Sequence, residues 1–192
     1  VHDYIDAGSD IITVHAEVCD ESSFGEICDM LNSNQVGIGL AINPDTELPQ
    51  WCYKFVELLD QVIIMSVVPG KSGQKFIEST HEKIRRIAKD LREHKFEGYI
   101  EADGGVNLEN IGACFEDGAR AFVGGSAIIG QNDVRMIIKE FRNQVLESRR
   151  RLLIKKAHDL GGTELVNSWI DLHVVGEKKD KLVQIAKELG FQ

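Results

Sequence analysis

The sequence predicts an α/β protein built around a parallel β-sheet, for two reasons. First, short runs of Ile, Val and other apolar residues alternate with amphipathic stretches along the chain. This alternation is typical of strand–helix units, whose strands run parallel. Second, glycine-rich or polar segments follow several of the apolar runs, at the point where the carboxyl ends of the strands would lie. Functional residues gather at those ends in α/β proteins.

The predicted strands are short and rich in β-branched residues. Residues 10–15 have the sequence Asp-Ile-Ile-Thr-Val-His, the pattern of a strand buried on both faces. Similar runs recur about every 25 residues, close to the length of one strand–helix unit. We predict these further strands at residues 36–42, 61–68, 98–102 and 120–123.

The predicted helices fill the intervals between the strands. The chain opens in a segment typical of the end of a helix, residues 1–7, with Gly8 as its C-cap. Ser22 is a suitable N-cap for a helix at residues 22–32. Further helices are predicted at residues 48–59, 80–94, 108–116, 133–160, 163–174 and 178–189. The basic run Arg149–Lys156 is compatible with an acidic partner or with a solvated helix face.

Two folds accommodate this alternation, a doubly wound open sheet and a (β/α)8 TIM barrel. The GxGxxG fingerprint of the doubly wound sheet is absent, so we favour the barrel. A barrel needs about 250 residues, whereas about five units occur here. We therefore predict a partial barrel at residues 1–146, with N-terminal strands missing from this chain, and a helical C-terminal extension at residues 147–192. A half barrel exposes strand edges, so we expect the missing strands or a homo-oligomer to cover them.

Composition and charge argue against several kinds of partner. The formal net charge is −9 and the pI is near 5.2, which disfavours non-specific nucleic-acid binding. No apolar run has the length of a membrane span, and no signal-peptide pattern opens the chain. The cysteines form no CxxC pair, as expected of free thiols in a reducing compartment. We expect a cytoplasmic protein with no nucleic-acid and no membrane partner.

The most informative segments are Glu101-Ala102-Asp103-Gly104-Gly105-Val106-Asn107 and Val123-Gly124-Gly125-Ser126. Each places a glycine pair at the end of a predicted strand, where the backbone can turn sharply and leave its N–H groups bare. Two such turns side by side form a nest of amide donors suited to a phosphate. Asp103 would repel a phosphate, so we interpret it as a proton-transfer group or a metal ligand. Either segment alone is also compatible with an ordinary turn between a strand and a helix.

Further segments extend this pattern along the chain. In order, the whole set is Ile12-Thr13-Val14-His15-Ala16-Glu17, Gly39-Leu40-Ala41-Ile42-Asn43-Pro44-Asp45-Thr46, Met65-Ser66-Val67-Val68-Pro69-Gly70, Gly73-Gln74-Lys75-Phe76-Ile77, Asp103-Gly104-Gly105-Val106-Asn107 and Gly125-Ser126-Ala127-Ile128. With this order and spacing, residues 1–146 resemble the ribulose-phosphate 3-epimerase family. By this resemblance the chain begins just before the fourth strand of the family's barrel.

The resemblance implies an isomerase of carbohydrate metabolism, acting in the pentose phosphate pathway. Members of the family interconvert D-ribulose 5-phosphate and D-xylulose 5-phosphate by proton transfer at C3 on opposite faces of the sugar, through an enediolate. Two Asp act as acid/base groups and, together with two His, hold a divalent metal. Of these residues only Asp103 has a counterpart in this sequence, as a catalytic residue and as a metal ligand. The implied metal is zinc, with iron, manganese or cobalt as alternatives.

The substrate-binding residues of the family transfer more completely. The resemblance implies that backbone amides hold the phosphate at Gly70, Lys71, Ser72, Gly73, Gly104, Gly105, Gly125 and Ser126. Met65 would exclude water beside the reacting carbons, or else simply pack in the core. His15 and Glu17 match a segment that lines the family's site without binding its metal, so they are either site-lining or structural.

One departure from the family pattern leaves the substrate open. The family loop has Pro-Gly-Phe-Gly-Gly-Gln where this chain has Pro69-Gly70-Lys71-Ser72-Gly73-Gln74. Lys71 replaces an apolar lid contact by a positive charge. This change either tightens the hold on the phosphate or indicates another phosphorylated ketose, such as a hexulose 6-phosphate. The remaining alternatives are a non-catalytic phosphosugar-binding module and another phosphate-binding barrel enzyme.

Overall fold

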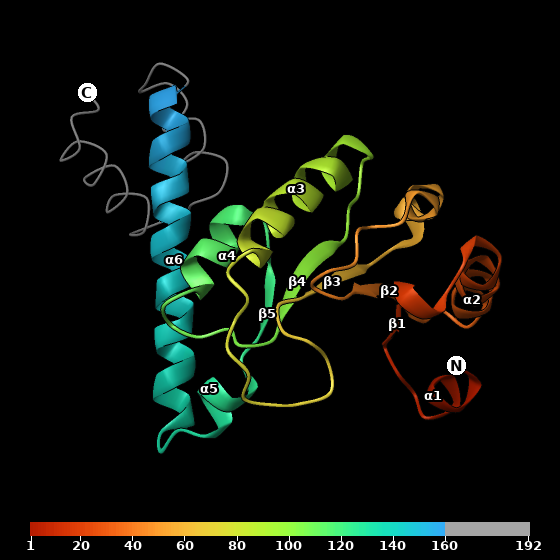
Figure 1. Cartoon of the computed structure of the whole chain (residues 1–192), viewed down its shortest axis with the longest axis horizontal. Coiled ribbons are helices and arrows are strands. Elements are labelled where there is room, and N and C mark those ends of the chain that lie inside the picture. Colours follow the sequence, from red (N-terminus) through yellow and green to blue (C-terminus); the bar gives the residue numbers. More distant parts are fainter. Residues whose placement is uncertain (160–192) are drawn as a thin grey trace, which may run out of the picture. The chain divides into compact units, whose positions relative to one another are not determined.

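The computed structural model describes residues 1–159 and has an α/β architecture built on parallel strands. The strands lie in the order β1-β2-β3-β4-β5 (Figure 1). They are β1 (Ile11–His15), β2 (Gly37–Ile42), β3 (Gln61–Met65), β4 (Tyr99–Asp103) and β5 (Ala121–Val123). The predicted strands are therefore confirmed, although residues 66–68 have already left the sheet after β3.

Helices precede, connect and follow the strands. They are α1 (His2–Asp6), α2 (Glu21–Ser33), α3 (Thr80–Glu93), α4 (Ile111–Asp117), α5 (Gly125–Ile129) and α6 (Val134–Asp159), with 3₁₀ helices η1 (Ala16–Val18), η2 (Gln50–Lys54) and η3 (Val56–Leu58). None of the helices in this part of the chain combines the length and the apolar character needed to cross a membrane. The helices predicted at 163–174 and 178–189 lie outside the described residues.

Two local predictions are wrong, each for an identifiable reason. Residues 48–59 form η2 and η3 and not one α-helix, because Trp51 and Phe55 turn inward onto Phe24, at ring distances of 5.1 and 5.4 Å. Packing thus overrides the local pattern. The N-cap of α2 is Asp20 and not Ser22, since the Asp20 carboxylate accepts the Ser23 N–H at 2.8 Å and forms a capping box.

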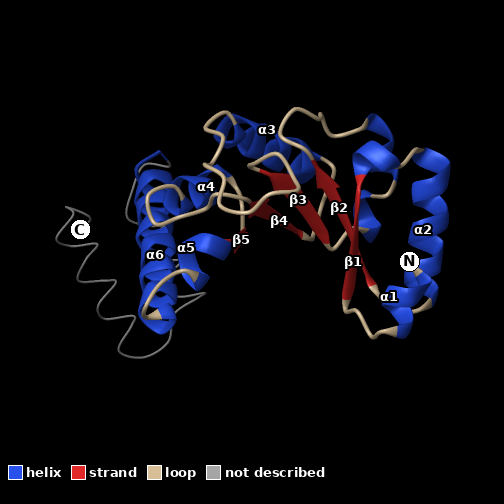
Figure 2. Ribbon diagram, turned by 60° about the horizontal axis from the view of Figure 1, so that its bottom comes forward, coloured by secondary structure: helices blue, strands red, loops and turns tan. Residues whose placement is uncertain are grey.

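The two faces of the sheet differ in chemistry. Helices α2, α3 and α4 pack on one face through a common apolar core (Figures 1 and 2). That face carries alternate strand residues that are almost fully buried, Ile38, Leu40, Ile42, Val62, Ile64 and Ile100. The opposite face carries half-buried polar side chains, and β4 shows the alternation most clearly with Glu101 and Asp103 on this side. The candidate residues within the strands, Asp103 and Met65, therefore lie on the face opposite the helices.

The strand order bears on the choice between the two predicted folds. Each new strand is added on the same side of the previous one, and neighbouring strands are parallel throughout. A doubly wound sheet reverses its strand order at a switch point, next to which its ligands bind. No such reversal occurs among the described strands.

The chain divides into two compact units, Val1–Val145 and Leu146–Gln192. The sheet and all the predicted site residues belong to the first unit. Helix α6 begins in the first unit and continues into the second. The nature of residues 1–146 as a partial barrel and of 147–192 as a helical extension stays a prediction.

Candidate active site at the carboxyl ends of the strands

Asp103 is the last residue of β4 and lies in register with Met65 of β3 and Val123 of β5. Its side chain is half-buried, and no hydrogen bond from residues 1–159 contributes to the pKa of its carboxyl group. Burial raises the pKa of the Asp103 carboxyl, while the nearby charge of His15 acts in the opposite direction. A carboxyl group whose pKa is raised toward neutrality is suited to taking up and returning a proton.

The turn after Asp103 is fixed by a buried serine. The Ser66 N–H donates to the Asp103 carbonyl at 2.7 Å, and the Ser66 hydroxyl donates to the Gly104 carbonyl at 2.5 Å. Ser66 is fully buried, so these bonds are protected from water. Sequence reasoning did not single out Ser66, although a serine between the apolar residues Met65 and Val67 is a signal that a buried partner is needed.

Gly104 and Gly105 adopt left-handed backbone conformations, with φ of +114° and +65°. A side chain at Gly105 would also meet the chain before α3, because its Cβ would lie 2.4 Å from the Phe76 nitrogen. Glycine is therefore required here both for the turn and for the close approach of two loops. This geometry agrees with the turn that the sequence predicts.

The predicted phosphate-binding residues occupy three neighbouring loops. Gly70, Lys71, Ser72 and Gly73 follow β3, Gly104 and Gly105 follow β4, and Gly125 and Ser126 begin α5 after β5. The loop after β3 is closed by Gln74, whose side-chain amide donates to the carbonyls of Val68 at 2.6 Å and Lys71 at 2.8 Å. The order of the strands thus brings the three predicted segments to one edge of the sheet.

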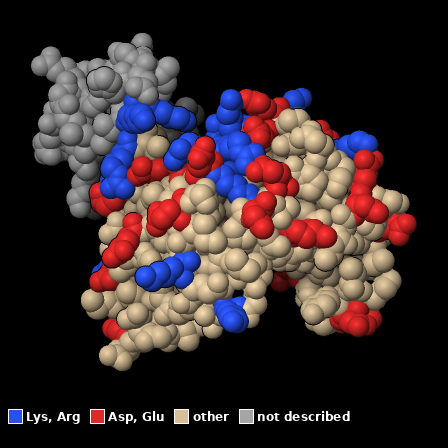
Figure 3. All heavy atoms as spheres, viewed as in Figure 1, with Lys and Arg blue, Asp and Glu red and all other residues tan. Residues whose placement is uncertain are grey.

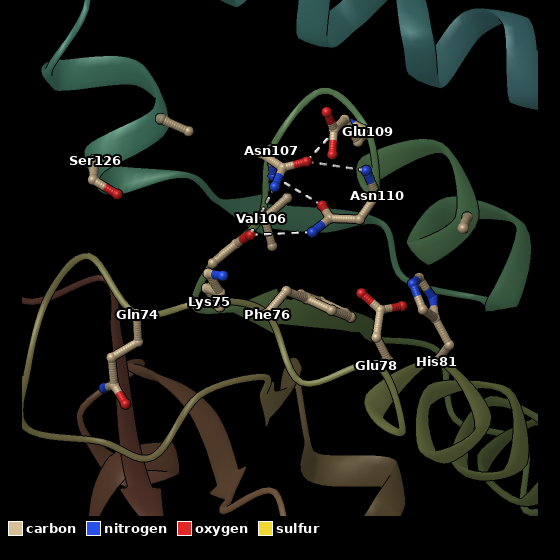
Figure 4. A pocket seen from close by; sticks show the side chains of 13 residues that line it. Gln74, Lys75, Phe76, Glu78, His81, Val106, Asn107, Glu109, Asn110 and Ser126 are labelled. Atoms are coloured by element: carbon tan, nitrogen blue, oxygen red, sulfur yellow. Dashed lines mark hydrogen bonds between the residues drawn. The ribbon is translucent and has the colours of Figure 1, made fainter.

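A groove of about 740 Å³ runs beside these loops (Figure 4). Gly105 and Ser126 line it, whereas Asp103 and Met65 do not. The other lining residues are Gln74, Lys75, Phe76, Glu78, His81, Val106, Asn107, Glu109, Asn110, Ala113 and Ala127. On one wall Asn110 holds the glycine turn, since its side chain donates to the Gly105 carbonyl at 3.1 Å and accepts the Asn107 N–H at 2.8 Å. The groove therefore lies next to the predicted phosphate turns and apart from the carboxylate of Asp103.

A chain of polar side chains crosses the sheet on the Asp103 face. The Thr13 hydroxyl donates to Gln61 Oε1 at 3.4 Å, and Gln61 Nε2 donates to Glu101 Oε2 at 2.8 Å. Gly39 of β2 lies between these strands, and a Cβ there would lie 2.1 Å from the Thr13 hydroxyl. Burial, and next the charge of Asp103, raise the pKa of the Glu101 carboxyl. Sequence reasoning missed this chain, although polar residues inside apolar strands are a signal for it.

Met65, His15 and Glu17 also lie at this edge. Met65 is 8% exposed at the end of β3, which is compatible with both of its predicted roles. His15 ends β1 on the same face as Asp103, and its Nδ1 lies 3.2 Å from Glu17 Oε2. Glu17 in turn accepts the Asn43 N–H at 2.6 Å. His15, Glu17 and Asn43 therefore form a hydrogen-bonded group.

The described residues do not by themselves fit the divalent metal that the resemblance implies. Within residues 1–159 no three His, Cys, Asp or Glu side chains come together as a metal site. Asp103 offers one carboxylate, whereas zinc takes four ligands and other divalent ions take more. We therefore derive no step of the reaction through a metal.

The three thiols at Cys28, Cys52 and Cys114 are buried, and Cys19 is partly exposed. All four cysteines are free, as the sequence predicts. Burial, with a smaller contribution from the Asp117 charge, raises the pKa of Cys114 to about 12. A thiol with so high a pKa is not ionised at neutral pH and is a poor nucleophile.

Comparison with known proteins agrees with the predicted resemblance. The model of the ribulose-phosphate 3-epimerase family matches residues 1–129. A ribulose-phosphate 3-epimerase of Escherichia coli K12 is 37% identical over 145 residues, which are 76% of this chain and 63% of that protein. The corresponding protein of Bacillus subtilis is 39% identical over 137 residues, covering 71% of this chain and 62% of its own length.

Among solved structures, 3-hexulose-6-phosphate synthase from Salmonella typhimurium has a similar fold. The TM-score is 0.54 at 18% identity, and the match covers 74% of this chain and 64% of that one. So distant a likeness shows the fold alone. The chain spans less than two thirds of the length of these curated relatives. Its match to the family model and its identity to these relatives nevertheless show that the chain belongs to the ribulose-phosphate 3-epimerase family.

Proposed function

We propose that the complete protein interconverts D-ribulose 5-phosphate and D-xylulose 5-phosphate by epimerisation at C3. The observation that carries this proposal is the position of Asp103. It is a half-buried carboxyl group with a raised pKa, directly followed by the left-handed Gly104-Gly105 turn. A proton-transfer group and a phosphate-binding turn are thus consecutive in the chain, which suits a small phosphorylated ketose.

In the proposed reaction the Asp103 carboxylate takes the proton from C3. The electron pair of the broken C–H bond forms a double bond between C2 and C3, and the C2 carbonyl oxygen takes up the negative charge as an enediolate. A proton returned to C3 on the opposite face completes the inversion. The resemblance assigns that second transfer to another Asp, which has no counterpart in this sequence. Asp103 is also the one metal ligand that we propose this chain supplies, with zinc as the first choice.

The surroundings of Asp103 support this role. Met65 is buried beside it in the sheet register, so a thioether limits the access of water to the reacting carbons. We propose that the amides of residues 70–73, 104–105 and 125–126 bind the phosphate, with the Lys71 ammonium adding a positive charge. Lys71 is exposed and lies in the loop after β3.

We further propose that the sheet is part of a (β/α)8 barrel. Support comes from the unreversed strand order and from the packing of α2, α3 and α4 on one face. In a barrel, the other face points inward and functional residues lie at the carboxyl ends of the strands. Asp103, Met65 and His15 are all at those ends.

The test is incorporation of solvent deuterium at C3 of D-ribulose 5-phosphate, followed by NMR with the complete protein. We expect exchange with the natural sequence. Asp103→Asn should lower its rate by about 10²- to 10⁴-fold, the usual contribution of a general acid/base. The affinity for substrate, measured by calorimetry, should change little because the phosphate turns are intact. Asp29→Asn, an exposed Asp of α2, is the matched control and should exchange normally.

Three outcomes decide between the candidate functions. Substantial exchange by Asp103→Asn contradicts the role given to Asp103. Faster turnover of a hexulose 6-phosphate than of the pentulose phosphate favours the alternative substrate that Lys71 indicates. If the complete protein binds the sugar phosphate but exchanges no proton, it is a phosphosugar-binding module and not an epimerase.

A further inference from the structure

Lys83 of α3 is a buried cation that the proposed reaction does not use. The residue is only 6% exposed, although lysine is rarely buried without partners. Its ammonium donates to the backbone carbonyls of Asn43 at 2.5 Å, Pro44 at 3.2 Å and Thr46 at 2.5 Å. An ammonium has three hydrogens, so its donor capacity is fully used. All the acceptors belong to one loop, residues 43–46, which follows β2.

This loop is held from its other side by Glu17. The Asn43 N–H donates to Glu17 Oε1 at 2.6 Å, and the Thr46 side chain donates to the same carboxylate. Lys83 therefore binds the carbonyl groups of the loop while Glu17 binds its donors. Two opposite charges fix four residues at the carboxyl end of β2, where the proposed site lies.

Glu17 also determines which nitrogen of His15 carries hydrogen. Its second oxygen, Oε2, lies 3.2 Å from His15 Nδ1. Burial acts to raise the pKa of Glu17, but hydrogen bonds from Asn43, Thr46 and His15 outweigh it and the pKa is lowered. Glu17 is then ionised at neutral pH and can only accept, so Nδ1 must donate. The neutral ring is left with Nε2 as an acceptor, and no other described side chain bonds to it.

We propose that Lys83 is a positioning residue of the site, acting through the 43–46 loop and Glu17 to fix the orientation and tautomer of His15 on the Asp103 face. The influence of Lys83 on His15 passes along the hydrogen bonds just described. The expected effect on catalysis rests on the proposed function, whereas the hydrogen bonds that connect Lys83 to His15 do not. Removing the ammonium would take this shared donor from the carbonyls of Asn43, Pro44 and Thr46 and so loosen the loop.

The test uses the complete protein and the substitutions Lys83→Met and Glu17→Gln. Lys89→Met is the matched control, because Lys89 lies on the same helix with its side chain 73% exposed. We expect Lys83→Met to lower kcat by about 10- to 100-fold, as misplacement of a site residue does, with KM changed less than about twofold. In a His15→Asn background the same substitution should lower kcat less than about twofold, since the group it positions is absent.

A spectroscopic measurement separates this inference from the proposed function. The ¹⁵N chemical shifts of the His15 ring report its tautomer in alkaline buffer, where imidazoles are neutral. We expect Nδ1–H in the natural protein and in Lys89→Met, and a mixture of tautomers in Lys83→Met. Glu17→Gln, at the partly exposed end of the chain of bonds, should give the same mixture even if Lys83→Met fails to fold.

The inference is overturned if the tautomer is unchanged in both variants, or if the effects of Lys83→Met and His15→Asn on kcat simply multiply. If the tautomer changes as expected but the natural protein exchanges no C3 proton, the positioning role stands and the proposed function fails.

Discussion

At Gly105 there is no room for a methyl group. The φ angle is +65°, and an added Cβ would lie 2.4 Å from a backbone nitrogen that cannot move without its loop. We expect Gly105→Ala to lower the free energy of unfolding by about 2 kcal/mol or more, because left-handed strain and a backbone clash add. Unfolding in urea measures this, and calorimetry with inorganic phosphate measures the accompanying loss of affinity.

The same chemical change at Gly25 should have the opposite sign. Gly25 lies within α2, where an added Cβ would be in ordinary contact with the Phe55 ring at 3.5 Å. Alanine is favoured over glycine in a helix by up to about 1 kcal/mol, so Gly25→Ala should stabilise the protein. Equal stabilities for the two variants would contradict this reading of the glycine turn.

The sequence predicts some site residues and misses others for a physical reason. Asp103 and its glycine pair are consecutive, so a strand followed by Gly-Gly is enough to find them. Ser66 and Lys83 donate hydrogen bonds to residues that are 38 and 40 positions away in the sequence. Gln61 donates to Glu101, which is also 40 positions away. Such pairings depend on which strands become neighbours, which the local pattern does not contain.

Among the elements, the N-terminus of α2 offers a direct test of a helix cap. Asp20→Ala should destabilise the protein at neutral pH, since the Ser23 N–H loses its acceptor. Ser22→Ala, the position that sequence alone would choose, should have little effect. Chemical unfolding of both variants at the same pH measures the difference.

The cap also makes stability depend on pH in a defined direction. Hydrogen bonds from Ser23 lower the pKa of Asp20 below its ordinary value of 3.8. The contribution of the cap is therefore complete above 3.8 and is lost as the pH falls through the lower value of the folded state. The difference in stability between the natural protein and Asp20→Ala should be constant from about pH 7 to 5 and vanish near about pH 2. A difference that grows in acid would contradict the capping geometry.

The elements were predictable where burial and local pattern agree. Strands β1 to β5 carry alternating or continuous apolar runs and were found to within a few residues. The segment at residues 48–59 has a helical spacing of apolar residues, but the contact of Trp51 and Phe55 with Phe24 divides it. That aromatic contact links residues far apart in the chain, so the sequence alone does not reveal it.

On the scale of the whole molecule, charge is mixed and not segregated along α3 (Figure 3). Arg85 pairs with Asp117 at 2.8 Å, and Arg86 pairs with Glu47 at 2.5 Å. The Asp117 side chain is only 8% exposed, and its Oδ2 also lies 2.7 Å from His81 Nδ1. These contacts join α3 to α4. His81, Arg85 and Arg86 of α3 therefore make contacts between elements of the protein.

The outer strands of the sheet lead to a prediction about association. Within the described sheet, β1 and β5 each pair with one strand only. Unpaired strand edges favour pairing with another chain. We therefore keep the proposal of a homo-oligomer and expect the 192-residue chain to sediment as a dimer or larger species. A stable monomer at micromolar concentration in sedimentation velocity would contradict it.

Asp103, Gly104 and Gly105 are consecutive in the chain, and this fixes the distance between the proposed acid/base group and the proposed phosphate turn. Ser66 binds the first two carbonyls of this segment, so the proposed acid/base group and the proposed phosphate turn form one rigid piece. The distance between the reacting carbon and the phosphate is then fixed by the protein. We expect a sugar longer by one carbon to be accommodated by the loop of residues 70–73, which does not belong to this rigid segment. Exchanging that loop between relatives should therefore transfer the preference for sugar length while leaving proton transfer in place.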